Sequence, residues 1–121
     1  IIKQKPVSVL EKFSTLSPGQ IGLSVITVAE LEYGARKSLS IEKNLSSLRQ
    51  FLIPFDIFSF DFNATIEYGI IRNELEAKGM PIGPLDTLIA AHAKSLNYIL
   101  VTNNEKEFKR VSGIQIENWA K

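Results

Sequence analysis

The sequence contains no cysteine and only one histidine, His92. The lack of cysteine excludes disulfide bonds, thiolate metal sites and a cysteine nucleophile, and one histidine is too few for a histidine-rich metal site. A chain without cysteine suits a reducing compartment, so we expect a cytoplasmic protein.

Neither sign of charge predominates, because 14 basic and 13 acidic side chains leave a formal net charge of +1. The charge of the whole molecule therefore does not predict nucleic acid, a membrane or an acidic protein as the partner, and any such partner has to be recognised by a local patch. No apolar run approaches the roughly 20 residues of a membrane helix, and no basic segment followed by an apolar one predicts a signal peptide. We therefore expect no membrane association.

The chain also lacks a glycine-rich phosphate loop such as G-x-x-x-x-G-K-[ST], which argues against a nucleotide-binding or phosphatase-like α/β domain. Its 121 residues, 45% of them hydrophobic, fit a single domain over residues 1–121.

Short β-branched runs alternate with helical patterns along the chain. A buried strand is predicted over residues 21–27, and a helix follows from Thr27 with Val28, Leu31 and Ala35 facing the core. The other predicted elements are helices from Pro6, over 41–51, from a cap at Asp61 to a stop at Gly79, and from 83 to 97, with strands at 55–60, 98–102 and 114–116 before Trp119. No hairpin signal interrupts this order, so we predict a parallel α/β sheet flanked by helices, with ligand sites beyond the carboxyl ends of the strands.

Asp86 is a single carboxylate at the head of a segment of apolar and small residues, "MPIGPLDTLIAAHA". One interpretation is structural, since a carboxylate in the first turn of a helix is stabilised by the helix dipole by about 0.3 to 1 kcal/mol. The other is functional, because Asp86 shares a helix face with Ala90 and Ala93, and small residues let another backbone or a ligand approach closely. The predicted core face is a leucine-rich stripe that begins at Leu85, on which His92 is expected to be packed and hydrogen-bonded.

Glu30 also has two interpretations. Thr27 and Glu30 have the spacing of a capping box, in which the glutamate reaches back to the amide of the capping residue. Alternatively Glu30 faces a cleft, because it lies with Tyr33 and Lys37 opposite the predicted core stripe.

Polar residues follow the strand predicted at 98–102. By default Asn103 and Asn104 are turn formers, and Glu105 and Glu107 form a solvated face. Acidic groups are nevertheless expected to gather near one edge of the sheet.

Three stretches, in this order, carry a family resemblance: "ITVAELEYGA", "GMPIGPLDTLIAAHA" and "ILVTNNEKEFKRV" followed by "IENW". Each is a weak signal alone, but their order and spacing resemble the VapC toxins, the ribonuclease half of bacterial toxin–antitoxin pairs, over essentially all 121 residues. The resemblance implies the PIN-domain fold.

By this resemblance Glu30 matches the glutamate of the family's "EL" motif, and Asp86 matches the aspartate that heads the "D..IAA" helix, so both are expected metal-site residues. Many relatives have aspartate where this chain has Asn104, which can still orient a water or a metal ligand, and some have a carboxylate at the position of Glu107. Relatives open with a strand containing "LDTN", whose aspartate is the first metal-binding carboxylate. That motif is absent from the printed sequence, so we expect the chain as printed to lack its N-terminal central strand and one carboxylate, and to be unstable or inactive unless the molecule contains them.

The resemblance further implies a metal-dependent endoribonuclease that cleaves structured RNA, in several members tRNA at the anticodon stem-loop. Clustered carboxylates raise one another's pKa, so Mg²⁺, or Mn²⁺ in its place, is the expected cofactor. Asp86 would hold the ion together with the missing aspartate, and Glu30 would bind a second ion or position the attacking water.

The implied protein partners are a second copy of the chain and a cognate VapB-type antitoxin, whose tail fills the cleft and brings a basic residue to the acidic site. Lys37, Arg72 and Lys78 are candidate contacts for RNA phosphates, with an ordinary solvated surface charge as the default interpretation of each. The alternative is a PIN-like interaction module without activity, which the missing aspartate and Asn104 favour.

Overall fold

The computed structural model describes residues 22–118. In chain order the elements are β1 (Gly22–Ser24), α2 (Val25–Arg36), α3 (Ile41–Leu52), β2 (Asp56–Phe58), α4 (Phe62–Ala77), α5 (Pro84–Leu96), β3 (Leu100–Val101), α6 (Glu105–Phe108) and β4 (Ile116–Glu117). The strands form two parallel pairs, β1 with β2 and β3 with β4. The predicted parallel α/β class is confirmed, with short strands and long helices.

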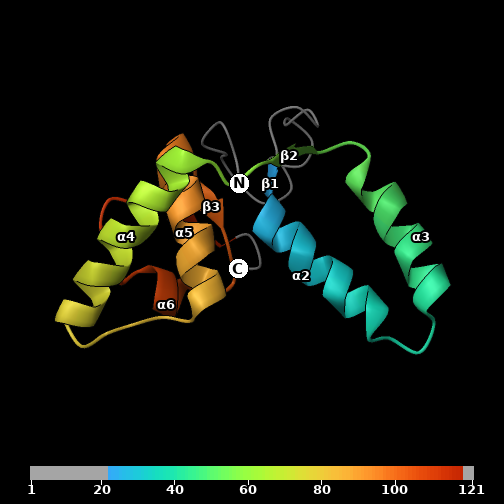
Figure 1. Cartoon of the computed structure of the whole chain (residues 1–121), viewed down its shortest axis with the longest axis horizontal. Helices are drawn as coiled ribbons and strands as arrows, with labels where there is room; N and C mark the ends of the chain where they lie inside the picture. Colours follow the sequence, from blue (N-terminus) through green and yellow to red (C-terminus); the bar gives the residue numbers. More distant parts are fainter. Residues whose placement is uncertain (1–21, 119–121) are drawn as a thin grey trace.

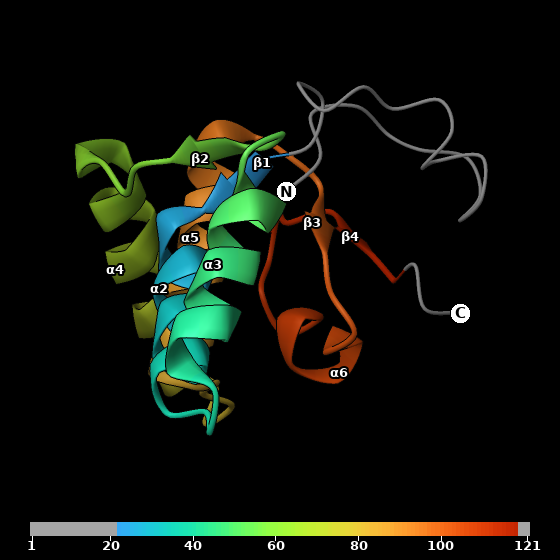
Figure 2. The ribbon, with the colours of Figure 1, turned by 90° about the vertical axis from the view of Figure 1, so that its right-hand side faces the viewer.

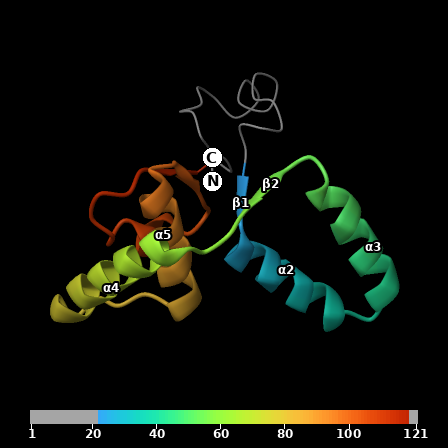
Figure 3. The same cartoon turned by 45° about the horizontal axis from the view of Figure 1, so that its top comes forward.

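Two helix pairs define the arrangement of the molecule. Figure 1 shows α2 and α3 side by side on one side, and α4 and α5 side by side on the other. The β1–β2 pair bridges the two helix pairs, as seen most clearly in Figure 3. Figure 2 shows β3, β4 and α6 gathered to one side of these helices.

The junction of β1 and α2 differs from the sequence-based prediction. Ser24 is the N-cap, and its Oγ accepts a hydrogen bond from the amide of Ile26 at 3.1 Å. The strand therefore ends at Ser24 and the helix begins at Val25, before the predicted boundary at Thr27. Because Thr27 lies inside the helix and the cap is elsewhere, the capping-box interpretation of Glu30 is wrong.

The centre of the core lies where α5 packs on α4. Ala90, Ala91 and Ala93 of α5 are 0% exposed and pack in one cluster with Ile71 of α4. Small side chains let the two helices approach closely, which places the alanine face at the contact. The predicted leucine-rich core stripe of α5 is wrong in part, because Leu85 is 47% exposed.

Local signals fix the two ends of α4. Oδ1 of Asp61 accepts a hydrogen bond from the Ala64 amide at 3.1 Å, as expected of an N-cap aspartate. Gly79 has a φ of +68° directly after the helix, the left-handed conformation that ends helices. Both predicted boundaries of this helix are confirmed.

His92 is buried where α5 meets β1 and the segment after β2. Its Nε2 lies 3.0 Å from the carbonyl oxygen of Ser59, and its Nδ1 lies 2.7 Å from Oγ of Ser24. A carbonyl oxygen only accepts, so Nε2 carries the proton and donates it, and Nδ1 accepts from the Ser24 hydroxyl. The ring of Phe60 meets the imidazole edge-on at a centroid distance of 5.4 Å. The expectation of a packed, hydrogen-bonded histidine is confirmed.

Some predictions fall on residues outside the described range. These are the helix from Pro6, the first residue of the strand at Ile21, and Trp119.

Across residues 22–118, none of the helices has both the length and the apolar character needed to span a bilayer.

Candidate functional site

A cavity of about 470 Å³ lies where α2, α5 and the segment after β3 meet, and we call it the carboxylate cavity. Its lining residues are Thr27, Glu30, Leu31, Asp86, Ile89, Leu100, Val101, Thr102, Asn104 and Phe108. The predicted site residues Glu30, Asp86 and Asn104 therefore reach one cavity from separate elements, although their roles stay predictions.

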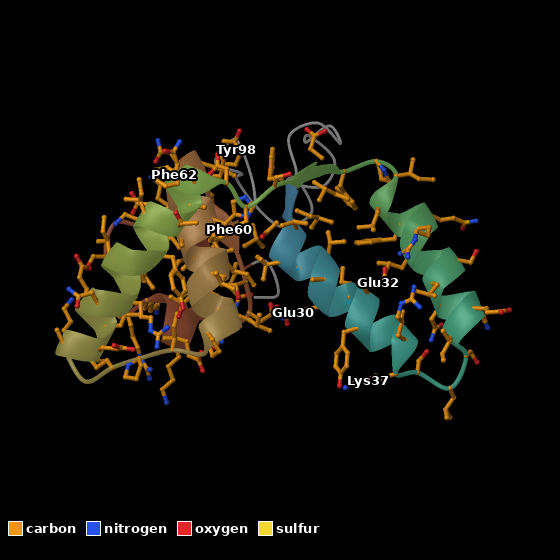
Figure 4. All side chains as sticks on the ribbon, viewed as in Figure 1. Glu30, Glu32, Lys37, Phe60, Phe62 and Tyr98 are labelled. Carbon is orange, nitrogen blue, oxygen red and sulfur yellow. The ribbon has the colours of Figure 1, made fainter. Side chains whose placement is uncertain are left out.

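Glu30 reaches the cavity from α2. Its side chain is exposed and lies on the side of the helix that faces α5 (Figure 4). Leu31 lines the same cavity and is 39% exposed, so its predicted place in the core is wrong. On this helix the buried residue is Ala35, which packs toward α3 near the other end.

Asp86 stands in the first turn of α5, whose N-cap Gly83 has no side chain to contribute. Its carboxylate is half-buried, and Nδ2 of Asn104 donates a hydrogen bond to its Oδ2 at 3.4 Å. Burial raises the pKa of Asp86 most, followed by its contact with Glu107 and the negative charges of Glu107 and Glu30, while the Asn104 amide lowers it. The helix dipole alone would lower this pKa, so burial and the neighbouring carboxyl groups have the larger effect on it.

Glu107 is closer to the site than its default interpretation as a solvated side chain. It is half-buried on α6, a helix that starts after Asn104, and it is close enough to Asp86 to raise the pKa of that residue. The available signal was its place directly before Phe108, which is 3% exposed and fixes α6 to the core. Both alternatives for the fourth acidic position, Asn104 and Glu107, thus lie beside Asp86.

The donor chemistry of the carboxylate cavity fits a hard divalent cation. Of its lining residues, Glu30 and Asp86 provide carboxylate oxygens and Asn104 provides an amide oxygen, which are the ligands that such ions prefer. Glu107 lies beside Asp86 but does not line the cavity. Burial and then the repulsion from Glu107 and Glu30 raise the pKa of Asp86, and a bound cation would relieve both effects. No group of three acidic or histidine side chains within residues 22–118 is close enough to hold an ion alone. Water or further groups therefore have to complete the coordination.

Comparison with known proteins identifies the family. The PIN domain model matches residues 4–114 of the chain. The tRNA(fMet)-specific endonuclease VapC of Shigella flexneri is 44% identical over 119 residues, which cover 98% of this chain and 89% of the relative. This chain is a PIN-domain protein of the VapC family. The resemblance in the three sequence motifs is therefore confirmed.

Solved structures agree with this VapC-family assignment. DNA-bound VapBC from Salmonella typhimurium has a TM-score of 0.86 and 44% identity, over 97% of this chain and 88% of that chain. VapBC2 from Rickettsia felis, bound to a DNA fragment from its promoter, has a TM-score of 0.80 and 49% identity, over 82% of this chain and 74% of that chain. PIN-domain nucleases are in general dependent on a divalent metal, in line with the donor set of the carboxylate cavity.

Proposed function

We propose that this VapC-family chain is the endoribonuclease toxin of a VapBC-type toxin–antitoxin pair and acts on structured RNA, in particular tRNA. The observation that carries the proposal is the presence of Glu30, Asp86 and Asn104 in one cavity of about 470 Å³. A relative that is 44% identical and named a tRNA(fMet)-specific endonuclease supports tRNA as the substrate. The cofactor is Mg²⁺, for which Mn²⁺ can substitute.

Asp86 is the residue that we assign first to the metal. Its raised pKa, caused by burial and by Glu107 and Glu30, is the behaviour of a carboxylate placed where a cation belongs. When bound, Mg²⁺ stabilises negative charge on the phosphoryl oxygens during in-line displacement. Glu30 lies on the other wall of the cavity, where it orients the attacking water or holds a second ion.

Asn104 acts as a positioning residue in this proposal. Its amide donates to Oδ2 of Asp86 at 3.4 Å, which orients that carboxylate and leaves the other oxygen, Oδ1, for the ion. A neutral side chain here keeps the charge of the site lower than an aspartate would, while Glu107 supplies a carboxylate from the same side.

A VapB-type antitoxin and a second copy of the chain are the proposed protein partners, and the cytoplasm is the proposed location. The relatives from Salmonella typhimurium and Rickettsia felis are VapBC complexes, which supports an antitoxin here too. Leu39 and Ile53 are 106% and 79% exposed, and partner proteins can cover such apolar side chains. A basic side chain of the antitoxin is expected to enter the carboxylate cavity.

We assign residues 1–121 to one domain.

Cleavage of a tRNA transcript by the purified full-length protein tests the proposal. We expect strand cuts with Mg²⁺, none with EDTA, and a loss of rate on the order of 100-fold or more in Asp86→Ala. Glu42→Gln is the matched control, because Glu42 is an exposed acid in the first turn of α3. Circular dichroism of each variant separates a lost site from a lost fold.

If the wild-type protein leaves every RNA intact with both Mg²⁺ and Mn²⁺, yet binds its antitoxin, the inactive interaction module is the correct alternative. If Asp86→Ala is folded and cuts at the wild-type rate, the assignment of the carboxylate cavity is wrong.

A further inference from the structure

A second cavity, of about 550 Å³, lies along the face of α2 that includes Glu30, and we call it the α2 groove. Its lining includes Ala29, Glu30, Tyr33 and Gly34 of α2, the C-cap residue Lys37, and Leu85 of α5. Glu30 also lines the carboxylate cavity, so the two spaces adjoin at this residue. Figure 4 shows Glu30 and Lys37 on the same helix, with Lys37 nearer its C-terminal end.

Tyr33 and Lys37 form an exposed pair in the α2 groove. The ring of Tyr33 is 66% exposed, and Nζ of Lys37 lies 5.2 Å from the ring centroid. The neighbouring cations Arg36 and Arg49 are instead bound to Glu32. Lys37, by contrast, has its charge over an aromatic face.

The remaining walls of the α2 groove are small or apolar. Leu85 is 47% exposed on the α5 side, although leucine gains from burial. A Cβ added at Gly34 would meet nothing within 4 Å, so the space beside Tyr33 is open. Proteins bind unpaired nucleotides with an aromatic ring on which the base stacks, apolar side chains beside it and a cation that contacts the phosphate.

We infer that the α2 groove binds one unpaired nucleotide of the RNA, next to the phosphate that is cleaved, with its base stacked on Tyr33 and its phosphate contacted by Lys37. This inference rests on the proposed RNA cleavage and extends it. The carboxylate cavity repels a polyanion, and the net charge of +1 gives little attraction, so RNA needs local contacts beside the acidic residues. Tyr33 and Lys37 provide them where Glu30 joins the two cavities.

Steady-state cleavage of a tRNA transcript tests this role. We expect Tyr33→Ala to lower kcat/KM by about 5- to 150-fold, mainly through KM, and Tyr33→Phe to stay within about twofold, because stacking needs the ring and not the hydroxyl. Lys37→Ala should also raise KM. It should reduce the slope of log KM against log salt by about 1, the value expected for the loss of one phosphate contact. The matched controls are Phe62→Ala, an aromatic that is 76% exposed on α4, and Lys43→Ala on α3, and both should behave as wild type.

A binding measurement without turnover gives a second readout. In an Asp86→Asn background, a labelled RNA with an abasic nucleotide beside the mapped cut should bind more weakly than the intact RNA. That difference should disappear when Tyr33→Ala is added, because the stacking partner is already gone.

The inference is overturned if Tyr33→Ala and Lys37→Ala match Phe62→Ala in KM while Asp86→Ala abolishes cleavage, since the proposed function then stands without the nucleotide contact. It is also overturned if Tyr33→Ala weakens only the antitoxin, which would assign the α2 groove to that partner. If Asp86→Ala cleaves normally, the failure lies in the proposed function itself.

Discussion

The hydroxyl of Ser24 lies 2.7 Å from Nδ1 of His92, and this contact joins the two helices that carry the predicted metal-site carboxylates. Ser24 caps α2, which carries Glu30, and His92 lies on α5, which carries Asp86. Nε2 of His92 continues the chain to the carbonyl oxygen of Ser59 at 3.0 Å. The spacing of the two carboxylates therefore depends on a neutral, buried histidine.

Replacing Ser24 with alanine should destabilise the protein by about 2 to 4 kcal/mol. The loss of an N-cap costs about 1 kcal/mol, and a buried acceptor left without its donor, here Nδ1 of His92, costs about 1 to 3 kcal/mol. Chemical denaturation measures the change. Ser46→Ala, at an exposed position of α3, is the control and should stay within about 0.5 kcal/mol. Equal stability of the two variants would show that the Ser24–His92 contact has no structural role.

The pKa of His92 should be below the ordinary value of 6.5 in the folded protein. Burial lowers the pKa of His92, although its hydrogen bond to the Ser59 carbonyl acts in the opposite direction. The neutral form is therefore favoured by the fold, so this contribution to stability is present above pH 6.5 and is lost as the pH falls through the lowered pKa. Because the sequence has a single histidine, its ring signals in a proton NMR titration are unambiguous. A midpoint at or above 6.5 would contradict the burial of a neutral imidazole.

Asp86→Asn should remove RNA cleavage and yet raise the thermal stability of the metal-free protein. The raised pKa of Asp86 means that its charged form is disfavoured by burial and by Glu107 and Glu30, so a neutral isostere relieves that penalty. In EDTA we expect an increase in Tm on the order of a few degrees. Adding Mg²⁺ should stabilise the wild type and leave the variant unchanged. A lower Tm for Asp86→Asn in EDTA would indicate a structural carboxylate instead.

Acid should weaken the contact between α2 and α3 through Glu32. Hydrogen bonds from Arg49 and Arg36 lower the pKa of Glu32 from 4.5 to about 2. Its contribution is therefore complete above pH 4.5 and is lost as the pH falls toward 2. The difference in Tm between the wild type and Glu32→Gln should shrink over that range. Glu76→Gln, which breaks the pair between Arg72 and Glu76 within α4, is the control and should show a smaller difference.

Local signals were enough to predict the ends of the longest helix. An aspartate cap and a glycine in the left-handed conformation act on their own turns, so Asp61 and Gly79 mark α4 without tertiary information. The start of α2 could not be predicted in the same way. Ser24 caps the helix through the Ile26 amide and is also hydrogen-bonded to His92, 68 residues later in the sequence, a contact that no local pattern encodes.

It was harder to predict which apolar side chains are buried in the core than to predict that the carboxylates line one cavity. Leu31 and Leu85 have the helical spacing of core residues but line cavities, while the alanines of α5 form the contact with α4. Periodicity reports which residues share a face and not which face meets a neighbour. Glu30 and Asp86 were expected near each other because each lies near the start of a predicted helix, and helices of a parallel α/β fold start at the carboxyl edge of the sheet. The place of Glu107 directly before the buried Phe108 was its only local signal, and that signal does not encode how α6 turns back toward Asp86.

Calorimetric titration of Mn²⁺ into the wild type, Glu30→Gln, Asp86→Asn and the double variant tests most directly whether Glu30 and Asp86 serve one metal site. We expect each single change to weaken binding by about 10-fold or more, and the double variant to lose less than the sum of the two, because both side chains act on the same ion or on adjacent ions. Wild-type affinity in either single variant, or strictly additive losses, would contradict a shared site in the carboxylate cavity.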